Sequence, residues 1–174
     1  MNKLSLLRSH HMPSITLDMA LDHLLGKEWS QAAVAKSRYS NGSLGKDIRD
    51  AEVANLDEDF YRVLNEEVGP IIDSYAKENN ILISKAEGYH IVKYSKGQFF
   101  KEHTDSTEEF PRKISAVLYL NDDYEGGTIT FSKLNTSFKP ESQTLFVFPS
   151  TEDFMHSADP VIDGTKYVVV GFWS

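Results

Sequence analysis

The spacing of hydrophobic and polar positions changes near residue 80 of the chain. Before this point, apolar residues recur at the intervals of amphipathic helices. After it, short segments alternate apolar and polar residues and are separated by turn residues. We therefore predict N-terminal helices followed by a β-rich region.

Two segments of the first 80 residues have helical spacing. The first follows Thr16, a favourable N-cap residue, and Gly26 would end it. The second spans residues 57–80, and its Gly69-Pro70 pair predicts a kink or a break because proline has no backbone N–H. The apolar face of this second helix is predicted to consist of Phe60, Leu64, Val68, Ile71 and Tyr75.

The remainder of the chain contains extended segments at regular intervals, which is typical of an antiparallel sandwich or barrel with helices on an outer face. We predict a single domain, with residues 1–80 as a helical support region and residues 81–174 as the barrel. The predicted strands cover residues 81–86, 89–94, 98–104, 113–120, 127–132, 143–148, 158–161 and 166–173.

The 174-residue length suits one domain with a sizeable core. The absence of cysteine excludes disulfides, iron–sulfur clusters, thiolate zinc sites and a cysteine nucleophile. A formal net charge of −8 argues against nucleic acid as the main partner. Because the sequence lacks a membrane-length apolar run and the order of a secretion signal, we expect a soluble, cytoplasmic protein with no membrane partner.

His103-Thr104-Asp105 closes one extended segment and is the main candidate for chemistry. Residues two apart on a strand leave from the same face, so an imidazole and a carboxylate can converge there. A barrel could bring His156 beside them. Two histidines and one carboxylate form the ligand set of non-haem Fe(II) oxygenases, but zinc hydrolases use similar ligands, and a His-x-Asp pair is most often plain polar surface. These residues alone leave the metal open.

Strict alternation would place Lys101 on the same face as His103, so we expect a twist or bulge in this strand. The other histidines are interpreted as structural or surface residues. His10 and His11 fall in an N-terminal stretch that we expect to be loose, and His23 lies on the polar side of the first helix. The fourth, His90, alternates with apolar neighbours.

Lys166 opens the last apolar strand, which has the composition of a strand buried on both faces. A buried ammonium is costly unless it is paired, and no acid lies close to it within the strand. A dicarboxylate ligand would supply the partner. A lysine that extends from a strand end to water is the alternative.

A set of residues spread from Tyr94 to Trp173 resembles the prolyl 4-hydroxylase branch of the Fe(II)/2-oxoglutarate-dependent dioxygenases in both order and spacing. One departure is Thr128-Ile129, where many relatives have Glu-Thr. This difference affects what the resemblance implies about the substrate more than what it implies about the reaction. The residues that carry the resemblance are Tyr94, His103-x-Asp105, Arg112, Tyr119-Leu120-Asn121, Tyr124-x-Gly126-Gly127, Phe131, Pro140, Phe148-Pro149, His156, Pro160-Val161 and Gly164-Thr165-Lys166-Tyr167.

The resemblance implies a role for individual residues. His103, Asp105 and His156 would bind Fe(II), and Lys166 would pair with the distal carboxylate of 2-oxoglutarate. It also implies a double-stranded β-helix, a jelly-roll-like barrel of about eight core strands.

Five further residues match the family at its co-substrate and substrate positions. Tyr94 and Tyr119, and as a weaker candidate Thr165, would line the 2-oxoglutarate pocket. Arg112 matches a position near the substrate, with a structural ion pair as the alternative. Arg49 resembles an N-terminal arginine motif on the substrate side.

The implied reaction consumes 2-oxoglutarate and O2, releases succinate and CO2, and hydroxylates a substrate at an Fe(II) centre. Ascorbate is a candidate reductant. The family favours peptidyl proline, so a peptide or protein is the expected partner, and residues 106–111 and 152–154 are candidate lid segments.

Three alternatives remain at this point. The substrate could be a free amino acid or another small molecule. The barrel could bind metal or 2-oxoglutarate as a non-catalytic sensor, or it could be a zinc-dependent hydrolase. The sequence gives no oligomeric state.

Overall fold

A computed structural model describes residues 3–24, 28–33 and 45–174 of the chain. Its elements, in order along the chain, are η1 (Lys3–Leu6), β1 (Arg8–His11), α1 (Leu17–Asp22), β2 (Ser30–Gln31), β3 (Arg49–Asp50), β4 (Glu52–Asn55), α2 (Glu58–Glu78), β5 (Ala86–Tyr94), β6 (Phe99–His103), β7 (Ile114–Tyr119), β8 (Glu125–Gly126), β9 (Ile129–Phe131), η2 (Ser132–Leu134), β10 (Thr136–Phe138), β11 (Thr144–Pro149), η3 (Glu152–Phe154), β12 (His156–Ala158), β13 (Val161–Asp163) and β14 (Lys166–Trp173).

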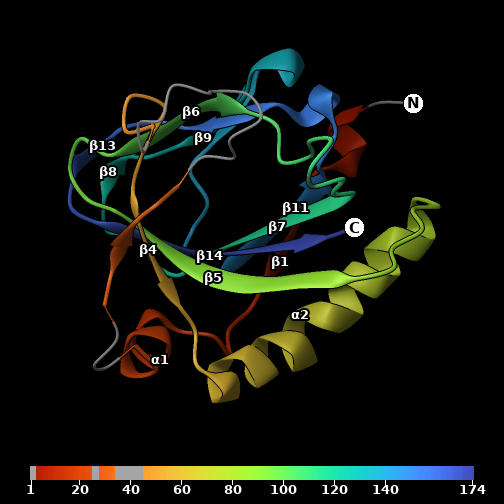
Figure 1. Cartoon of the computed structure of the whole chain (residues 1–174), viewed down its shortest axis with the longest axis horizontal. Coiled ribbons are helices and arrows are strands. Elements are labelled where there is room, and N and C mark those ends of the chain that lie inside the picture. Colours follow the sequence, from red (N-terminus) through yellow and green to blue (C-terminus); the bar gives the residue numbers. More distant parts are fainter. Residues whose placement is uncertain (1–2, 25–27, 34–44) are drawn as a thin grey trace.

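Two antiparallel sheets face each other (Figure 1). The larger sheet has the strand order β1-β11-β7-β14-β5-β4-β2, the smaller has the order β10-β9-β12-β6-β3, and β8 pairs with β13. From β5 onward the chain crosses repeatedly between them, because β5, β7, β11 and β14 belong to the larger sheet while β6, β9 and β12 belong to the smaller. This alternation defines the double-stranded β-helix, or jelly roll, so the predicted fold class is confirmed.

Alternation along the central strands produces two separate cores. Ile91 and Leu118 pack on the outer face of the larger sheet among residues of α1 and α2. Their neighbours Val92 and Tyr119 point the other way and pack between the two sheets. The helices therefore cover one face of the larger sheet and leave its other face to build a site with the smaller sheet.

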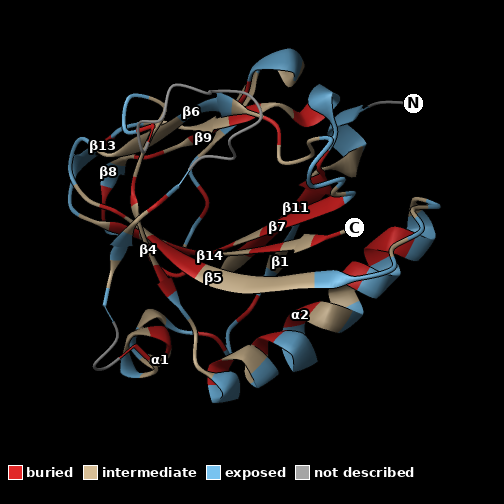
Figure 2. Ribbon diagram, in the orientation of Figure 1, coloured by how far each residue is buried: buried red, intermediate tan, exposed pale blue. Residues whose placement is uncertain are grey.

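The long helix α2 supports the larger sheet from outside (Figure 1). Asp57 caps it by accepting a hydrogen bond from the Phe60 backbone N–H at 2.8 Å. Buried residues recur along its length and concentrate on the strands of the larger sheet, as Figure 2 shows. The residues buried by the helix are Phe60, Leu64, Val68, Ile72, Tyr75 and Ala76.

Two details of the second helix differ from the simplest form of its prediction. The helix does not break at Gly69-Pro70 but continues through Pro70 to Glu78. Pro70 and Glu66, whose carbonyl loses its helical donor, are both exposed, so water can satisfy that carbonyl. Ile72 rather than Ile71 is the fully buried residue of this turn.

The other predicted elements differ mainly at their ends. The first helix begins after Thr16, whose side chain accepts from the Met19 N–H, and it ends at Asp22. Gly26 lies outside the described residues. Residues 81–85 form no strand; Ile81 and Ile83 pack against the helical core, and Leu82 is exposed.

The N-terminal region contributes strands as well as helices. The expectation of a loose N-terminus was wrong, since His10 and His11 lie on β1, which pairs with β11. β4 pairs with β5 in the larger sheet, and β3 pairs with β6 in the smaller. Such short strands leave little hydrophobic pattern in the sequence. Of the helices described, none has the length and apolar character required to cross a bilayer.

Candidate metal centre

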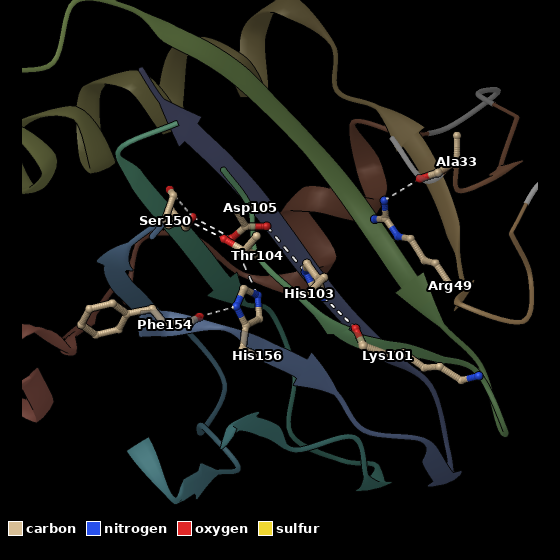
Figure 3. A network of polar contacts seen from close by, with 10 residues as sticks. Ala33, Arg49, Lys101, His103, Thr104, Asp105, Ser150, Phe154 and His156 are labelled. Carbon is tan, nitrogen blue, oxygen red and sulfur yellow. Dashed lines mark hydrogen bonds and ion pairs between the residues drawn. The ribbon is translucent and has the colours of Figure 1, made fainter. Parts of the chain in front are cut away.

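The three predicted ligands converge where β6 meets β12 (Figure 3). His103 ends β6, His156 begins β12, and the two are direct partners in the strand register. Asp105 follows β6 and lies between them, with Oδ1 at 3.6 Å from His103 Nε2 and Oδ2 at 3.7 Å from His156 Nε2. One ligand atom from each residue lies within 4.8 Å of the others, which allows all three to bind one ion.

A β-bulge in β6 produces this convergence. His156 pairs with His103 but Ala158 pairs with Phe100, so β6 holds one extra residue in this interval. The bulge puts Phe100 and His103 on the same face, where their rings stack with centroids 3.5 Å apart. Lys101 is exposed. The irregularity predicted from the position of Lys101 is therefore confirmed.

A hydrogen bond to a neighbouring group orients each of the three candidate ligands. His103 Nδ1 donates to the Lys101 carbonyl at 2.8 Å, and His156 Nδ1 donates to the Phe154 carbonyl at 3.0 Å. A carbonyl can only accept, so each Nδ1 carries the proton and each Nε2 presents its lone pair toward Asp105. The Ser115 hydroxyl donates to Asp105 Oδ2 at 2.7 Å and leaves Oδ1 free for a metal.

The electrostatics favour the protonation states that metal ligands require. Burial acts to raise the pKa of Asp105, but the His156 and His103 rings and the Ser115 hydroxyl outweigh it and hold the pKa well below its ordinary value. Burial, reinforced by His103, lowers the pKa of His156 to about 4. A carboxylate beside a neutral imidazole can accept a divalent cation without first losing a proton.

The three ligands line a cavity of about 370 Å³ that also contains Lys166. Lys166 is 2% exposed, and its Nζ donates to the Gly127 carbonyl at 2.7 Å. Burial lowers its pKa to about 8, while the charge of Asp159 acts in the opposite direction. A buried ammonium whose hydrogen bond goes to a neutral carbonyl is suited to receive a carboxylate from a ligand.

The predicted co-substrate residues are not all in the cavity. Tyr94 and Tyr119 line it, and their ring centroids lie 5.2 and 5.3 Å from Lys166 Nζ. Thr165 is not among the lining residues, and its carbonyl accepts a hydrogen bond from Asn121 Nδ2. The two tyrosines therefore lie beside the ammonium. Thr165, which precedes Lys166 in the chain, is not part of the cavity wall.

Both predicted arginines line the same cavity. Arg112 also makes the structural ion pair considered for it, because its Nε donates to Glu87 at 2.8 Å, and its guanidinium lies 3.7 Å from the Phe172 ring centroid. Arg49 Nη1 donates to the Ala33 carbonyl at 3.2 Å (Figure 3), while its Nε is buried and has no hydrogen-bond partner in the part of the chain that the structure describes.

The two candidate lid segments differ in their relation to the cavity. Thr107 and Phe110 of the first segment line it, and Phe110 is 39% exposed. The second segment is η3, which contributes the Phe154 carbonyl that orients His156. The first segment is therefore placed to cover the cavity, and the second supports a ligand.

His90 is a cavity residue that sequence reasoning missed. It lines the cavity, and burial together with Arg49 and Arg112 lowers its pKa to about 4. Its position could have been found by extending the strand alternation back from Tyr94, which places both residues on one face of β5.

The fold and this site define a class. Residues 89–174 match the family model described as the 2OG-Fe(II) oxygenase superfamily. Within it, the chain is similar to proteins of the prolyl hydroxylase type.

Two curated relatives illustrate the likeness in sequence. A putative prolyl 4-hydroxylase of Acanthamoeba polyphaga mimivirus is 27% identical over 139 residues, which cover 68% of this chain and 57% of that protein. A PKHD-type hydroxylase of Synechococcus sp. is 31% identical over 109 residues, which cover 59% of this chain and 48% of that protein. The chain thus spans about half the length of the curated relatives it matches.

Solved structures share the fold. A Trichoplax adhaerens prolyl hydroxylase in complex with a hypoxia inducible factor peptide fragment has a TM-score of 0.75 at 18% identity, covering 99% of this chain and 86% of that one. A viral collagen prolyl hydroxylase of Paramecium Bursaria Chlorella virus-1, in complex with 2OG, has a TM-score of 0.67 at 19% identity, covering 97% of this chain and 95% of that one.

The superfamily implies Fe(II), 2-oxoglutarate and O2, and the side chains of this cavity fit them. Two imidazole nitrogens and a carboxylate leave open positions on a metal. The buried Lys166 ammonium matches one carboxylate of a diacid.

Proposed function

We propose that this protein is an Fe(II)- and 2-oxoglutarate-dependent dioxygenase that hydroxylates its substrate and releases succinate and CO2. The observation that carries the proposal is one cavity with two features. The Nε2 atoms of His103 and His156 and the carboxylate of Asp105 converge in it, and it also contains the buried ammonium of Lys166.

Each cavity residue has a defined task in this proposal. His103, Asp105 and His156 hold the metal, which supplies the oxidative chemistry when it is bound. Lys166 binds the distal carboxylate of 2-oxoglutarate. Tyr94 lies with Tyr119 beside that ammonium and excludes water from the ion pair, which strengthens it.

We propose peptidyl proline as the substrate. Support comes from the mimivirus relative, which is named a putative prolyl 4-hydroxylase, and from the Trichoplax structure, which is a complex with a peptide fragment. The arginines and the aromatic residues Phe100, Phe110 and Phe172 in the cavity wall offer both charged and apolar contacts to a peptide.

We also propose that residues 1–174 act as one catalytic unit, with the barrel of residues 81–174 completed by the N-terminal region. β1, β2 and β4 extend the larger sheet, and β3 extends the smaller one. β3 carries Arg49 into the cavity wall, so a barrel without residues 1–80 would lack part of its site.

The test is turnover under air with Fe(II), 2-oxoglutarate and ascorbate, using proline-containing peptides and free amino acids in parallel. We expect succinate to form together with a mass gain of one oxygen atom in a peptide. His103→Ala should abolish both signals. Binding of 2-oxoglutarate without any succinate would identify a sensor, and oxygen transfer only to a free amino acid would replace the peptide as substrate.

A further inference from the structure

A second cavity, of about 480 Å³, adjoins the metal-binding cavity. Ala33, Arg49 and His90 line both, so a ligand that fills the first can continue past Arg49 into the second. The remaining residues of the second cavity come from β4, the first part of α2 and the beginning of β5, and they are Val53, Asn55, Tyr61, Glu87, Gly88 and Tyr89.

The charges of this second cavity are unbalanced. Glu87 is the one carboxylate among its described lining residues, and it already accepts from Arg112 Nε at 2.8 Å. Arg49 Nη1 donates to the neutral Ala33 carbonyl, and its guanidinium lies 4.8 Å from the Phe100 ring centroid and close enough to Tyr94 to act on the pKa of that phenol. These partners are uncharged, and among the described residues its buried Nε has no hydrogen-bond partner. Leaving a buried donor of a charged group unsatisfied is unfavourable, so this guanidinium has both charge and hydrogen-bonding capacity left for a ligand.

The lining of the second cavity also contains neutral polar groups. Tyr61 and Asn55 bring a phenol and an amide to the lining. Gly88 has a φ of +99°, and a Cβ built there would lie 3.2 Å from the Tyr61 hydroxyl oxygen. Glycine at this position therefore lets the Tyr61 side chain lie against the β5 backbone. The phenol and amide can donate to the same anion that Arg49 attracts.

From these contacts we propose that the second cavity is a subsite for a carboxylate-bearing residue of the substrate, next to the residue that is hydroxylated, and that Arg49 binds its carboxylate. This inference rests on the proposed function and narrows the substrate to an acidic peptide segment. Two adjoining cavities, each of the size that accommodates a separate small ligand, suit a chain of several residues better than a single amino acid.

At a formal net charge of −8, the surface as a whole repels acidic peptides. A local guanidinium is then needed to bind one. The N–H donors of a guanidinium bind a carboxylate in a defined orientation. The subsite would therefore select an acidic residue at one particular position next to the hydroxylated residue.

The test measures binding directly, so that it does not depend on turnover. The probes are fluorescein-labelled alanine-based peptides with a single proline, in which glutamate occupies each neighbouring position in turn, and matched peptides with glutamine. Fluorescence polarisation with the Mn(II)- and 2-oxoglutarate-loaded protein should show one glutamate position that binds at least about 10-fold more tightly than its glutamine counterpart.

Variants assign the preference to Arg49. Arg49→Gln should bind the glutamate and glutamine peptides with equal affinity, and Arg49→Lys should retain part of the preference for glutamate. Arg62→Gln is the matched control, because Arg62 lies on α2 with a side chain 67% exposed and pairs with the exposed Asp59. Tyr61→Phe removes one hydroxyl from the subsite and should reduce the preference for glutamate by a smaller factor. This second variant still tests the subsite if Arg49→Gln fails to fold.

The outcomes separate the subsite from the proposed function. Equal affinity for glutamate and glutamine peptides at every position, or a preference that survives Arg49→Gln, overturns the acidic subsite even if succinate forms. A preference lost in Arg49→Gln supports the subsite, and if no peptide then gains oxygen, it is the proposed dioxygenase activity that fails.

Discussion

The Ser115 hydroxyl lies 2.7 Å from Asp105 Oδ2 and is itself 2.7 Å from the Ser150 hydroxyl, so a short chain of hydroxyls leads from the core to the candidate metal ligand. Ser115 is fully buried on β7, in the larger sheet, whereas the two histidine ligands belong to the smaller one. The contact between Ser115 and Asp105 therefore ties the carboxylate to the sheet opposite its histidine partners.

Loss of this hydroxyl should weaken metal binding without removing a ligand. Because groups that orient metal ligands typically contribute a factor of about 10 to 100 in affinity, Ser115→Ala should bind Mn(II) about 10- to 100-fold more weakly in a calorimetric titration. Ser137→Ala removes an exposed hydroxyl that bonds Thr130, and its Mn(II) affinity should equal that of the wild type. Equal affinities in both variants would show that Ser115 does not support the ligand.

Removal of the buried ammonium should affect the co-substrate selectively. Lys166→Ala should lower 2-oxoglutarate affinity by about 10- to 150-fold, the range expected for one charge-assisted contact to a carboxylate. Its Mn(II) affinity should stay close to that of the wild type. Lys96→Ala, which removes an exposed ammonium that pairs with Asp163, is the control. An unchanged 2-oxoglutarate affinity in Lys166→Ala would remove the role assigned to that residue.

The burial of His90 predicts a pH dependence of stability in the metal-free protein. Its pKa in the folded protein is lowered from 6.5 to about 4. Between these values the unfolded chain binds a proton that the folded protein does not. The free energy of unfolding should therefore fall as the pH falls through this window, with a contribution from this group of at most about 1.4 kcal/mol per pH unit.

Chemical denaturation of the chelator-treated protein at several pH values measures that slope. His90→Gln should make it shallower, whereas His11→Gln, which alters an exposed histidine of β1, should not. A slope in His90→Gln as steep as that of the wild type would contradict the assignment of the buried imidazole.

The contribution of α2 to stability should be separable from the binding of 2-oxoglutarate. Leu64 is fully buried on α2 beneath the larger sheet, so Leu64→Ala should lower the free energy of unfolding by about 2–5 kcal/mol. Leu82 is 85% exposed, and Leu82→Ala should change the free energy of unfolding little. The folded Leu64→Ala protein should bind 2-oxoglutarate as the wild type does, and a large loss of affinity would show that α2 shapes the cavity more directly than proposed.

The sequence predicted those parts of the fold that leave a hydrophobic pattern. α2 and the central strands bury alternating or helically spaced side chains, and they appeared where expected. The edge strand β1 was missed, because its two histidines give no apolar pattern and its pairing with β11 depends on backbone hydrogen bonds. Pro70 misled the helix prediction because its cost depends on whether its face is exposed.

The site residues, like the strands and helices, could be predicted only where the sequence contains a local pattern. His103 and Asp105 could be paired from their spacing on one strand, and the position of Lys101 even indicated the bulge. A barrel allowed His156 to lie beside them, but its choice as third ligand depended on the resemblance to a family, since no local rule states which strand lies beside β6. The unpartnered Nε of Arg49 and the second cavity depend on how β3, β4 and α2 meet, and short-range patterns do not encode that.

The most direct test of the central claim is a crystal structure grown without oxygen in the presence of Mn(II) and 2-oxoglutarate. We expect the ion to be bound by the Nε2 atoms of His103 and His156 and by Asp105, and one carboxylate of 2-oxoglutarate to accept a hydrogen bond from Lys166 Nζ. An ion bound elsewhere, or a 2-oxoglutarate whose carboxylates both lie away from Lys166, would contradict the account.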